Sequence, residues 1–200
     1  MRKVVREYEI YSYKELEGEA KEKARDTISQ IIVDTNFGCL KEDLYEILEC
    51  DYDLKADNVD INYSLSYCQG DGLSFNCQDL LESKYFREKM YLGLSVNEKI
   101  SLSKMINKGE LSLFTKRSGC HLYQYALHSD VQALTNFYHW GKNKEELVEK
   151  VVKKLGRVYM EICGRLEKVG YSCYEVEEWE IEEYAECCLM QFTKDGTEFN

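Results

Sequence analysis

The sequence lacks the features that mark several large classes of protein. It contains no proline, and none of its apolar runs approaches the roughly eighteen residues that a membrane-spanning helix requires. Its first residues, MRKVVREYEIYSY, are charged at positions where a secretory signal would be apolar. Linker-like and repeated segments are missing as well. We therefore expect one domain over residues 1–200 that does not contact a membrane and stays in the cytoplasm.

The nine cysteines predict neither a disulfide framework nor a zinc site. Nine is an odd number, and no export signal accompanies them. No two of them stand in the C-x-x-C spacing, and the adjacent Cys187 and Cys188 would point in different directions on a helix. We expect reduced thiols, most of them small hydrophobic core residues, and no bound metal.

Catalytic motifs are also missing from the chain. It has no H-E-x-x-H, no G-x-S-x-G, no Walker loop and no dinucleotide fingerprint. The three histidines, His121, His128 and His139, lie in one segment, but His121 and His128 are seven residues apart and would face opposite sides of a strand. The sequence therefore predicts a protein that is not an enzyme and uses no cofactor.

The hydrophobic pattern alternates between strand-like and helix-like segments. VDINYSLSY alternates strictly between apolar and polar side chains, and together with LSFNC it predicts an antiparallel hairpin over residues 59–77. The other predicted elements are a strand at 3–13, helices at 18–33, 40–49, 96–107, 144–169 and 173–188, an amphipathic segment at 78–91, a second hairpin at 110–127 turned at Ser118–Gly119, and a strand and turn at 189–199. We therefore expect an α+β fold, in which a mainly antiparallel sheet packs against several helices, including the long one at 144–169.

Capping patterns indicate where some of these helices begin and end. Ser12 with Glu15, Ser95 with Glu98 and Asn143 with Glu146 have the spacing of a capping box or of a simple N-cap. Gly170 stands where a glycine commonly ends a helix, directly after the apolar stripe of the long helix.

The stretch SYCQGDGLSFNC contains the loop that most resembles a binding site. Its tip is formed by Gln69, Gly70, Asp71 and Gly72. A phosphate-binding loop needs free backbone N–H groups and usually a lysine, and the Asp71 carboxylate opposes an anion. A metal at Asp71 and Gln69 would leave most coordination positions to water. The pattern favours the turn of a hairpin, and any further role of the loop stays open.

The net charge of −11 is spread unevenly along the chain. Residues 161–200 contain 11 acidic and 3 basic side chains. The densest cluster, which meets no base in the sequence, consists of Glu175, Glu177, Glu178, Glu180, Glu182, Glu183 and Glu186. Charge of this sign repels phosphate backbones and favours a basic protein partner. The alternative is that these glutamates only form a solvated helix face.

The middle of the chain has the opposite charge. Residues 81–160 contain 14 basic and 8 acidic side chains. The basic residues of the 116–157 region are Lys116, Arg117, Lys142, Lys144, Lys150, Lys153, Lys154 and Arg157. They could form a nucleic-acid-binding face, or a solvated helix face balanced by Glu145, Glu146 and Glu149.

Several motifs together carry a resemblance to a known family. YSYKELEGEAKEKA, LKEDLYEIL, SYCQGDGLSFNC, SGCHLYQYALHSD, YMEICGRLEKVGYSCYE and QFTKDG follow one another along most of the chain. In this order they resemble phage, prophage and mobile-element proteins with an SQGDGASF-type motif. Members of that family are mostly uncharacterised, and some carry an antitoxin-like label.

The resemblance implies an origin in a phage or mobile element of a bacterial cell. Genes of this kind often encode inhibitors of host defence, and a small acidic protein without catalytic motifs is similar in character to anti-CRISPR proteins. We therefore expect a non-enzymatic inhibitor that binds a basic effector such as a CRISPR nuclease through Glu175–Glu186, in the channel that otherwise holds nucleic acid. An antitoxin-like or regulatory protein-binding module and a nucleic-acid-binding protein are the alternatives.

Overall fold

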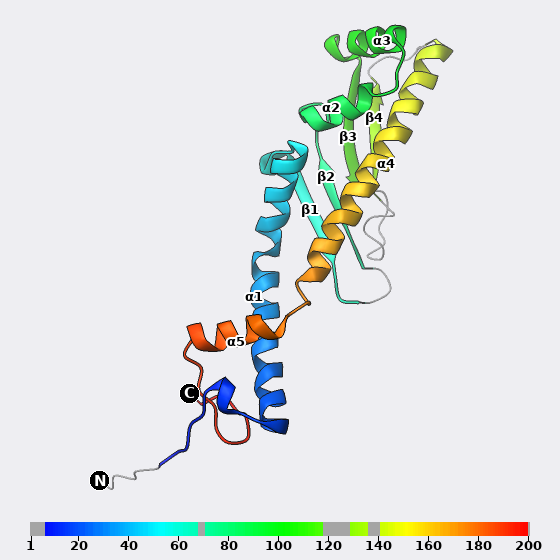
Figure 1. Ribbon diagram of the computed structural model, residues 1–200. Coiled ribbons are helices and arrows are strands. Elements are labelled where there is room, and N and C mark those ends of the chain that lie inside the picture. Colours follow the sequence, from blue (N-terminus) through cyan, green and yellow to red (C-terminus); the bar gives the residue numbers. More distant parts are fainter. Residues whose placement is uncertain (1–6, 68–70, 118–128, 136–140, 200) are drawn as a thin grey trace, which may run out of the picture. The chain divides into compact units, whose positions relative to one another are not determined.

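The structure is a computed structural model that describes residues 7–67, 71–117, 129–135 and 141–199 (Figure 1). It confirms the α+β class, with one antiparallel sheet and several helices. Contacts between residues divide the chain into two compact units. Unit 1 consists of Met1–Leu40 and Ser172–Asn200, and unit 2 consists of Lys41–Tyr171. No helix in the described ranges is long and apolar enough to span a membrane.

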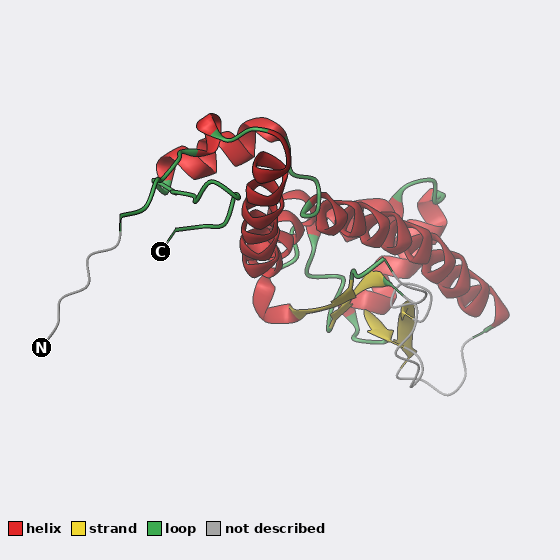
Figure 2. Cartoon of the chain, turned by 90° about the horizontal axis from the view of Figure 1, so that it is seen from below, coloured by secondary structure: helices red, strands yellow, loops and turns green. Residues whose placement is uncertain are grey.

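Unit 2 contains a four-stranded sheet in the order β1-β2-β3-β4 (Figure 1), and its strands are yellow in Figure 2. The strands are β1 (Val59–Ser64), β2 (Gly72–Cys77), β3 (Leu111–Arg117) and β4 (Ser129–Thr135), and each neighbouring pair is antiparallel. The predicted hairpin at 59–77 is confirmed by β1 and β2. The second hairpin was predicted too early, because β3 pairs with residues 129–135. The turn predicted at Ser118–Gly119 lies outside the described residues.

The pairing of β2 with β3 is completed by side-chain hydroxyl groups. Only Cys77 and Thr115 are in register between these strands. The Thr115 hydroxyl donates to the Phe75 carbonyl at 3.0 Å and accepts from the Cys77 N–H at 2.6 Å. The Tyr159 hydroxyl donates to the same carbonyl at 3.0 Å and accepts from the Phe75 N–H at 3.2 Å. These bonds satisfy backbone groups that would otherwise be buried without partners.

The long helix α4 (Lys142–Ser172) crosses this sheet (Figure 1). Its buried face is the apolar stripe predicted from the sequence, with Val151, Leu155, Tyr159 and Leu166 among its members. The helix extends beyond both predicted ends. Asn143 lies inside the first turn rather than at its cap. Gly170 lies inside the last turn and is buried, so it does not end the helix.

Two shorter helices of unit 2 begin where side chains can cap them. The helix α2 (Lys84–Tyr91) forms the second half of the predicted amphipathic segment, and the Ser83 hydroxyl accepts from the Phe86 N–H. The same hydroxyl donates to the Tyr52 carbonyl at 2.6 Å. The helix α3 (Val96–Asn107) matches its prediction, including the capping box formed by Ser95 and Glu98.

Unit 1 is built on residues 18–40 of α1 (Gly18–Tyr52). The two helices predicted at 18–33 and 40–49 are one continuous helix, because Gly38 does not interrupt it. Its apolar residues at every fourth position pack against the short helix η1 (Tyr13–Glu15) and against α5 (Glu178–Cys187). The core consists of Tyr13, Leu16, Ala24, Ile28, Ile32, Ile181, Ala185 and Phe192.

The strand predicted at 3–13 is wrong for the described part of that range. Residues 7–10 belong to no strand, and Tyr11 forms only an isolated antiparallel bridge with Phe192. Ser12 and Glu15 do bond each other, but at the start of η1 rather than of α1. Helix α5 begins five residues later than predicted, at Glu178.

The segment after α5 is fastened to α1 by the turn TKDGT. The Asp195 carboxylate accepts hydrogen bonds from Lys23, Thr193 and Thr197 at 2.6 to 2.8 Å. The hydrogen bond from Lys23, followed by those from Thr193 and Thr197, holds the pKa of Asp195 well below its ordinary value. Gly196 has a φ of +78°, and a Cβ built there would lie 2.0 Å from the carbonyl oxygen of Ala20. Only glycine allows this approach of two backbones.

Candidate partner-binding surface

Helix α5 presents its carboxylates on a side that its own packing determines. Ile181 and Ala185 are four residues apart and buried in the core of unit 1. Because a helix repeats every 3.6 residues, Trp179 and Glu183 project from the opposite side. Both are exposed, and the Trp179 side chain retains 63% of its accessible surface.

The Glu178 carboxylate is partly neutralised by bases of α1. It lies 3.1 Å from Arg25 Nε and 3.9 Å from Lys21 Nζ. It also accepts a hydrogen bond of 2.9 Å from the Tyr13 hydroxyl. Burial of Tyr13, followed by this bond, raises the pKa of that phenol well above its ordinary value.

Lys14 lies between two further carboxylates of α5. Its ammonium group bonds Glu186 and lies 4.0 Å from Glu182. The hydrogen bond to Glu186 is the main reason why the pKa of Lys14 is raised. The acidic cluster, which has no base beside it in the sequence, therefore meets bases in the fold. Lys14, Lys21 and Arg25 approach it from segments more than 140 residues away in the sequence, and no local pattern marks them.

The remaining carboxylates of the cluster have different roles. Glu180 accepts a hydrogen bond of 2.7 Å from the Glu177 N–H and so caps its own helix. Glu175, Glu177 and Glu183 are exposed and form no ion pair with any residue in the described ranges. Glu183 lies on α5, Glu177 is its N-cap residue and Glu175 precedes it. With Trp179 these three make up what we call the outer face of α5.

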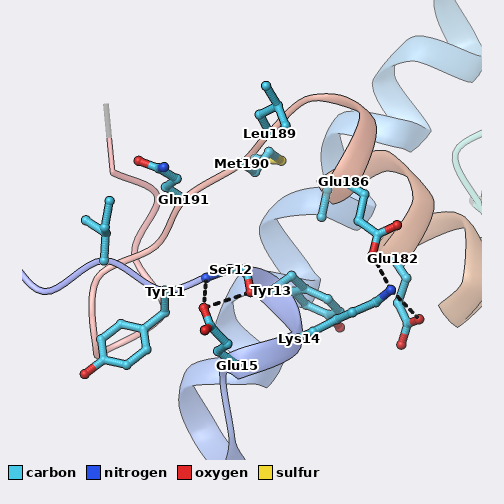
Figure 3. A pocket seen from close by; sticks show the side chains of 12 residues that line it. Tyr11, Ser12, Tyr13, Lys14, Glu15, Glu182, Glu186, Leu189, Met190 and Gln191 are labelled. Carbon is cyan, nitrogen blue, oxygen red and sulfur yellow. Dashed lines mark hydrogen bonds and ion pairs between the residues drawn. The ribbon is translucent and has the colours of Figure 1, made fainter.

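A groove adjoins the acidic cluster within unit 1 (Figure 3). It has a volume of about 550 Å³ and lies between residues 10–15 and the end of α5. Lys14, Glu182 and Glu186 form a charged wall, and the dashed lines in Figure 3 mark their contacts. Ile10 and Leu189 are apolar and stand exposed at its rim, at 44% and 83% of their accessible surface. Sequence reasoning missed both.

The Asp71 carboxylate of the glycine loop is used inside the protein. It accepts hydrogen bonds from the Ser66 N–H at 2.6 Å, the Ser64 hydroxyl at 3.1 Å and the Tyr171 hydroxyl at 3.0 Å. Burial and the bond to Asp71 raise the pKa of Tyr171 to about 12. Asp71 and Gly72 thus lie at the reversal between β1 and β2. Gln69 and Gly70 lie outside the described residues.

Four of the eight cations of the 116–157 region have partners within unit 2. Lys142 pairs with Glu146, Lys144 with Glu110 and Lys150 with Glu98, while Lys154 donates to the carbonyls of Met90 and Leu92. Lys153 and Arg157 form no ion pair with another described residue, and they line a hollow of about 540 Å³ beside β4. The exposed Lys116 does not line this hollow, and the side chain of Arg117 lies outside the described part of the chain.

Two of the seven described cysteines, Cys77 and Cys163, are buried, so the prediction that most cysteines are core residues is wrong for the described ones. Burial raises the pKa of Cys77 to about 11 and that of Cys163 to about 12, so both stay protonated at neutral pH. Cys39, Cys50, Cys187 and Cys188 are exposed. Among the residues that the structure describes, no group of three or more His, Cys, Asp and Glu side chains could hold a metal ion. The three histidines, Cys68 and Cys120 lie outside those ranges.

Comparison with known proteins leaves the function to be inferred from this surface. No protein-family model, no curated protein and no solved structure matches the chain. The resemblance to phage and mobile-element proteins therefore stays a prediction.

Proposed function

We propose that this protein is a non-catalytic inhibitor of the anti-CRISPR type, which binds a basic effector nuclease through the outer face of α5. The observation that carries this proposal is the exposed Trp179 among Glu175, Glu177 and Glu183, none of which has an ion-pair partner within the described ranges. The choice of a CRISPR nuclease rests on the resemblance to mobile-element proteins. The choice of a basic partner rests on the charge of the surface.

The composition of the outer face suits an interface that excludes nucleic acid from a channel. Tryptophan is among the residues that most often dominate the energy of a protein interface. Carboxylates around it speed association with a positively charged channel and determine how the partner is oriented. Since Ile181 and Ala185 fix α5 in the core, little conformational freedom is lost when the face is bound.

The net negative charge of unit 1 as a whole also favours a basic partner. It contains 17 acidic and 8 basic residues, whereas unit 2 contains 20 and 18. The ion pairs that Lys14, Lys21 and Arg25 make are exposed, so they hold these bases only weakly. The excess negative charge of unit 1 therefore extends beyond α5.

The test is the affinity for a purified CRISPR effector nuclease loaded with guide RNA. We expect Trp179→Ala, and the triple variant Glu175→Gln, Glu177→Gln, Glu183→Gln, each to weaken binding by about tenfold or more and to relieve inhibition of DNA cleavage. The matched control removes three exposed carboxylates from α1 by Glu42→Gln, Asp43→Asn and Glu46→Gln, and it should bind like the wild type. Unchanged affinity of both α5 variants would refute the proposal.

Nucleic-acid binding is a second candidate, favoured by the hollow at Lys153 and Arg157. These cations lie four residues apart on α4 and have Met160 one turn further on. If the hollow binds a phosphate backbone, the protein will bind single-stranded DNA with an affinity that falls steeply with salt. The double variant Lys153→Gln, Arg157→Gln should then make the affinity less dependent on salt. Lys142→Gln should not, because Lys142 already pairs with Glu146. Recovery of a small toxin in affinity purification would instead favour the antitoxin-like alternative.

A further inference from the structure

Leu189 has a backbone conformation that its side chain disfavours. It follows α5 directly, with a φ of +51°, in the left-handed region. The Met190 N–H bonds the Ala185 carbonyl at 2.9 Å, and the Leu189 N–H bonds the Glu186 carbonyl at 3.1 Å. This pattern ends many helices, and its left-handed position is usually occupied by glycine. A leucine there is strained, and its side chain is 83% exposed.

The two other described non-glycine residues with positive φ have internal contacts that explain them. Asp53 accepts a hydrogen bond of 2.7 Å from the Lys84 N–H. The ring of Tyr67 stacks on that of Tyr171 at 4.9 Å. At Leu189 the backbone N–H bonds are present, but the apolar side chain makes no ring contact or hydrogen bond with any described residue and is 83% exposed. Strain that no side-chain contact offsets is typical of residues kept for a function.

The surroundings of Leu189 identify the chemistry that it would meet. It stands at the rim of the groove together with Ile10 (Figure 3 shows Leu189 above the groove). The charged wall below it has two carboxylates, Glu182 and Glu186, and a single lysine between them. An apolar rim above a net negative wall is complementary to a segment with an apolar side chain next to an arginine or lysine.

We propose that Leu189 is an apolar anchor for the partner, and that the groove receives a basic segment in which an arginine or lysine adjoins an apolar residue. The proposal extends the proposed function, because it assigns part of the effector's contact to this groove. A guanidinium or ammonium group of the partner competes with Lys14 for Glu182 and Glu186. Ile10 and Leu189 enclose the adjoining apolar side chain.

The proposal predicts opposite effects on stability and on binding. Leu189→Gly should leave the melting temperature unchanged or raise it, because glycine accepts a positive φ. The same variant should weaken binding to the effector by about tenfold. Leu189→Ala keeps the strain and removes the anchor, so it should lose affinity without gaining stability. The control is Leu92→Ala in unit 2. Leu92 is 65% exposed but has an ordinary φ of −59°, so this variant should bind the effector like the wild type.

A second measurement tests the groove without any effector. The probes are an arginine–leucine pentapeptide and its arginine–serine counterpart, titrated into the full chain and followed by two-dimensional NMR. The leucine peptide should bind at least about fivefold tighter and shift the amides of residues 10–15 and 185–191, and Lys14→Met should strengthen its binding. Leu189→Gly should abolish the difference between the peptides. Equal affinities, or shifts confined to other segments, would overturn the proposal.

The two proposals fail in different ways. If the glutamate variants of the outer face no longer bind the effector and the Leu189 variants still do, the groove proposal is refuted and the inhibitor proposal is retained. If the peptides bind the groove and no effector binds the protein, the inhibitor proposal is refuted and the groove is retained as a binding site for basic segments. Sedimentation that reveals a dimer, lost in Leu189→Gly, would overturn the proposal by giving the groove to a second copy of the chain.

Discussion

The two compact units join their distant segments by different kinds of polar contact. In unit 1, Lys14, Lys23 and Arg25 reach acids near the end of the chain, and all of these pairs are at the surface. Unit 2 has exposed pairs as well, such as Lys150 with Glu98, but in addition the Tyr159 and Thr115 hydroxyls bond backbone atoms of β2 in its interior. Exposed ion pairs contribute little and are screened by salt, whereas a buried hydrogen bond is costly to break.

This difference indicates which unit is suited to exchange its contacts. A partner that enters unit 1 can replace a surface ion pair with one of its own at little cost. In unit 2 the hydroxyl bonds to β2 are covered, and a partner cannot reach them without unfolding the sheet, although exposed pairs such as Arg165 with Asp51 are present there as well. The proposed binding surface and the exchangeable contacts thus lie in the same unit, and we expect unit 2 to act mainly as a stable support.

The largest effect is expected from a change at Gly196, where two backbone segments of unit 1 approach each other closely. Gly196→Ala places a Cβ 2.0 Å from the Ala20 carbonyl oxygen at a φ of +78°. We expect the free energy of unfolding of unit 1 to fall by about 3 kcal/mol or more. Hydrogen exchange measured by mass spectrometry should show lost protection in α5 and the first half of α1, with protection retained in β2 and α4.

The matched control for this variant is Gly38→Ala. Gly38 lies in α1 within unit 1, and a Cβ there meets nothing within 4 Å. It should stabilise the helix by about 0.5–1 kcal/mol. If Gly196→Ala destabilised unit 1 no more than this control, the fastening role of the TKDGT turn would be disproved.

The units also differ in how far the sequence predicts them. In unit 2 the hairpin at 59–77 and helix α3 follow from strict alternation and from the Ser95 and Glu98 pair, which are local patterns. Even there, the partner strand of β3 was misplaced, because pairing across a connection of a dozen residues depends on tertiary contacts. In unit 1 the continuity of α1 was missed, because residues 34–39 lie between the two predicted apolar stripes and yet belong to the helix.

The candidate site was predicted only in part, for a physical reason. Seven glutamates in one segment predict an acidic surface; five of them lie on α5, and Glu175 and Glu177 lie just before it. Their neutralisation by Lys14, Lys21 and Arg25 depends on contacts across more than 140 residues, which spacing does not encode. The one local signal for Leu189 is the absence of glycine after the helix, where most helices have it.

A smaller effect is expected from removing one buried hydroxyl of unit 2. Tyr159→Phe keeps the ring packed on Phe75, at 4.7 Å between centroids, but leaves the buried Phe75 N–H without the hydroxyl that accepts from it. We expect a loss of about 1–3 kcal/mol in urea unfolding that does not depend on salt. The control is Tyr91→Phe, whose hydroxyl bonds Ser103 in a half-buried position and should cost about 0.5 kcal/mol or less. A salt-dependent loss at Tyr159 would remove the distinction between the two units.

The smallest expected effect concerns the surface ion pair of unit 2 that most resembles those of unit 1. Lys150, then the Ser95 N–H and hydroxyl, lower the pKa of Glu98 from 4.5 to about 2. Because the folded-state pKa is the lower one, Glu98 stabilises the fold above about pH 4.5, and this contribution is lost as the pH falls toward 2. Glu98→Gln should reduce the difference in stability between pH 5 and pH 2 relative to the wild type, and 0.5 M salt should reduce it as well. If the stability of the wild type and of Glu98→Gln changed equally between pH 5 and pH 2, the capping box of α3 would need no charge. Exposed ion pairs would then be as dispensable in unit 2 as we expect them to be in unit 1.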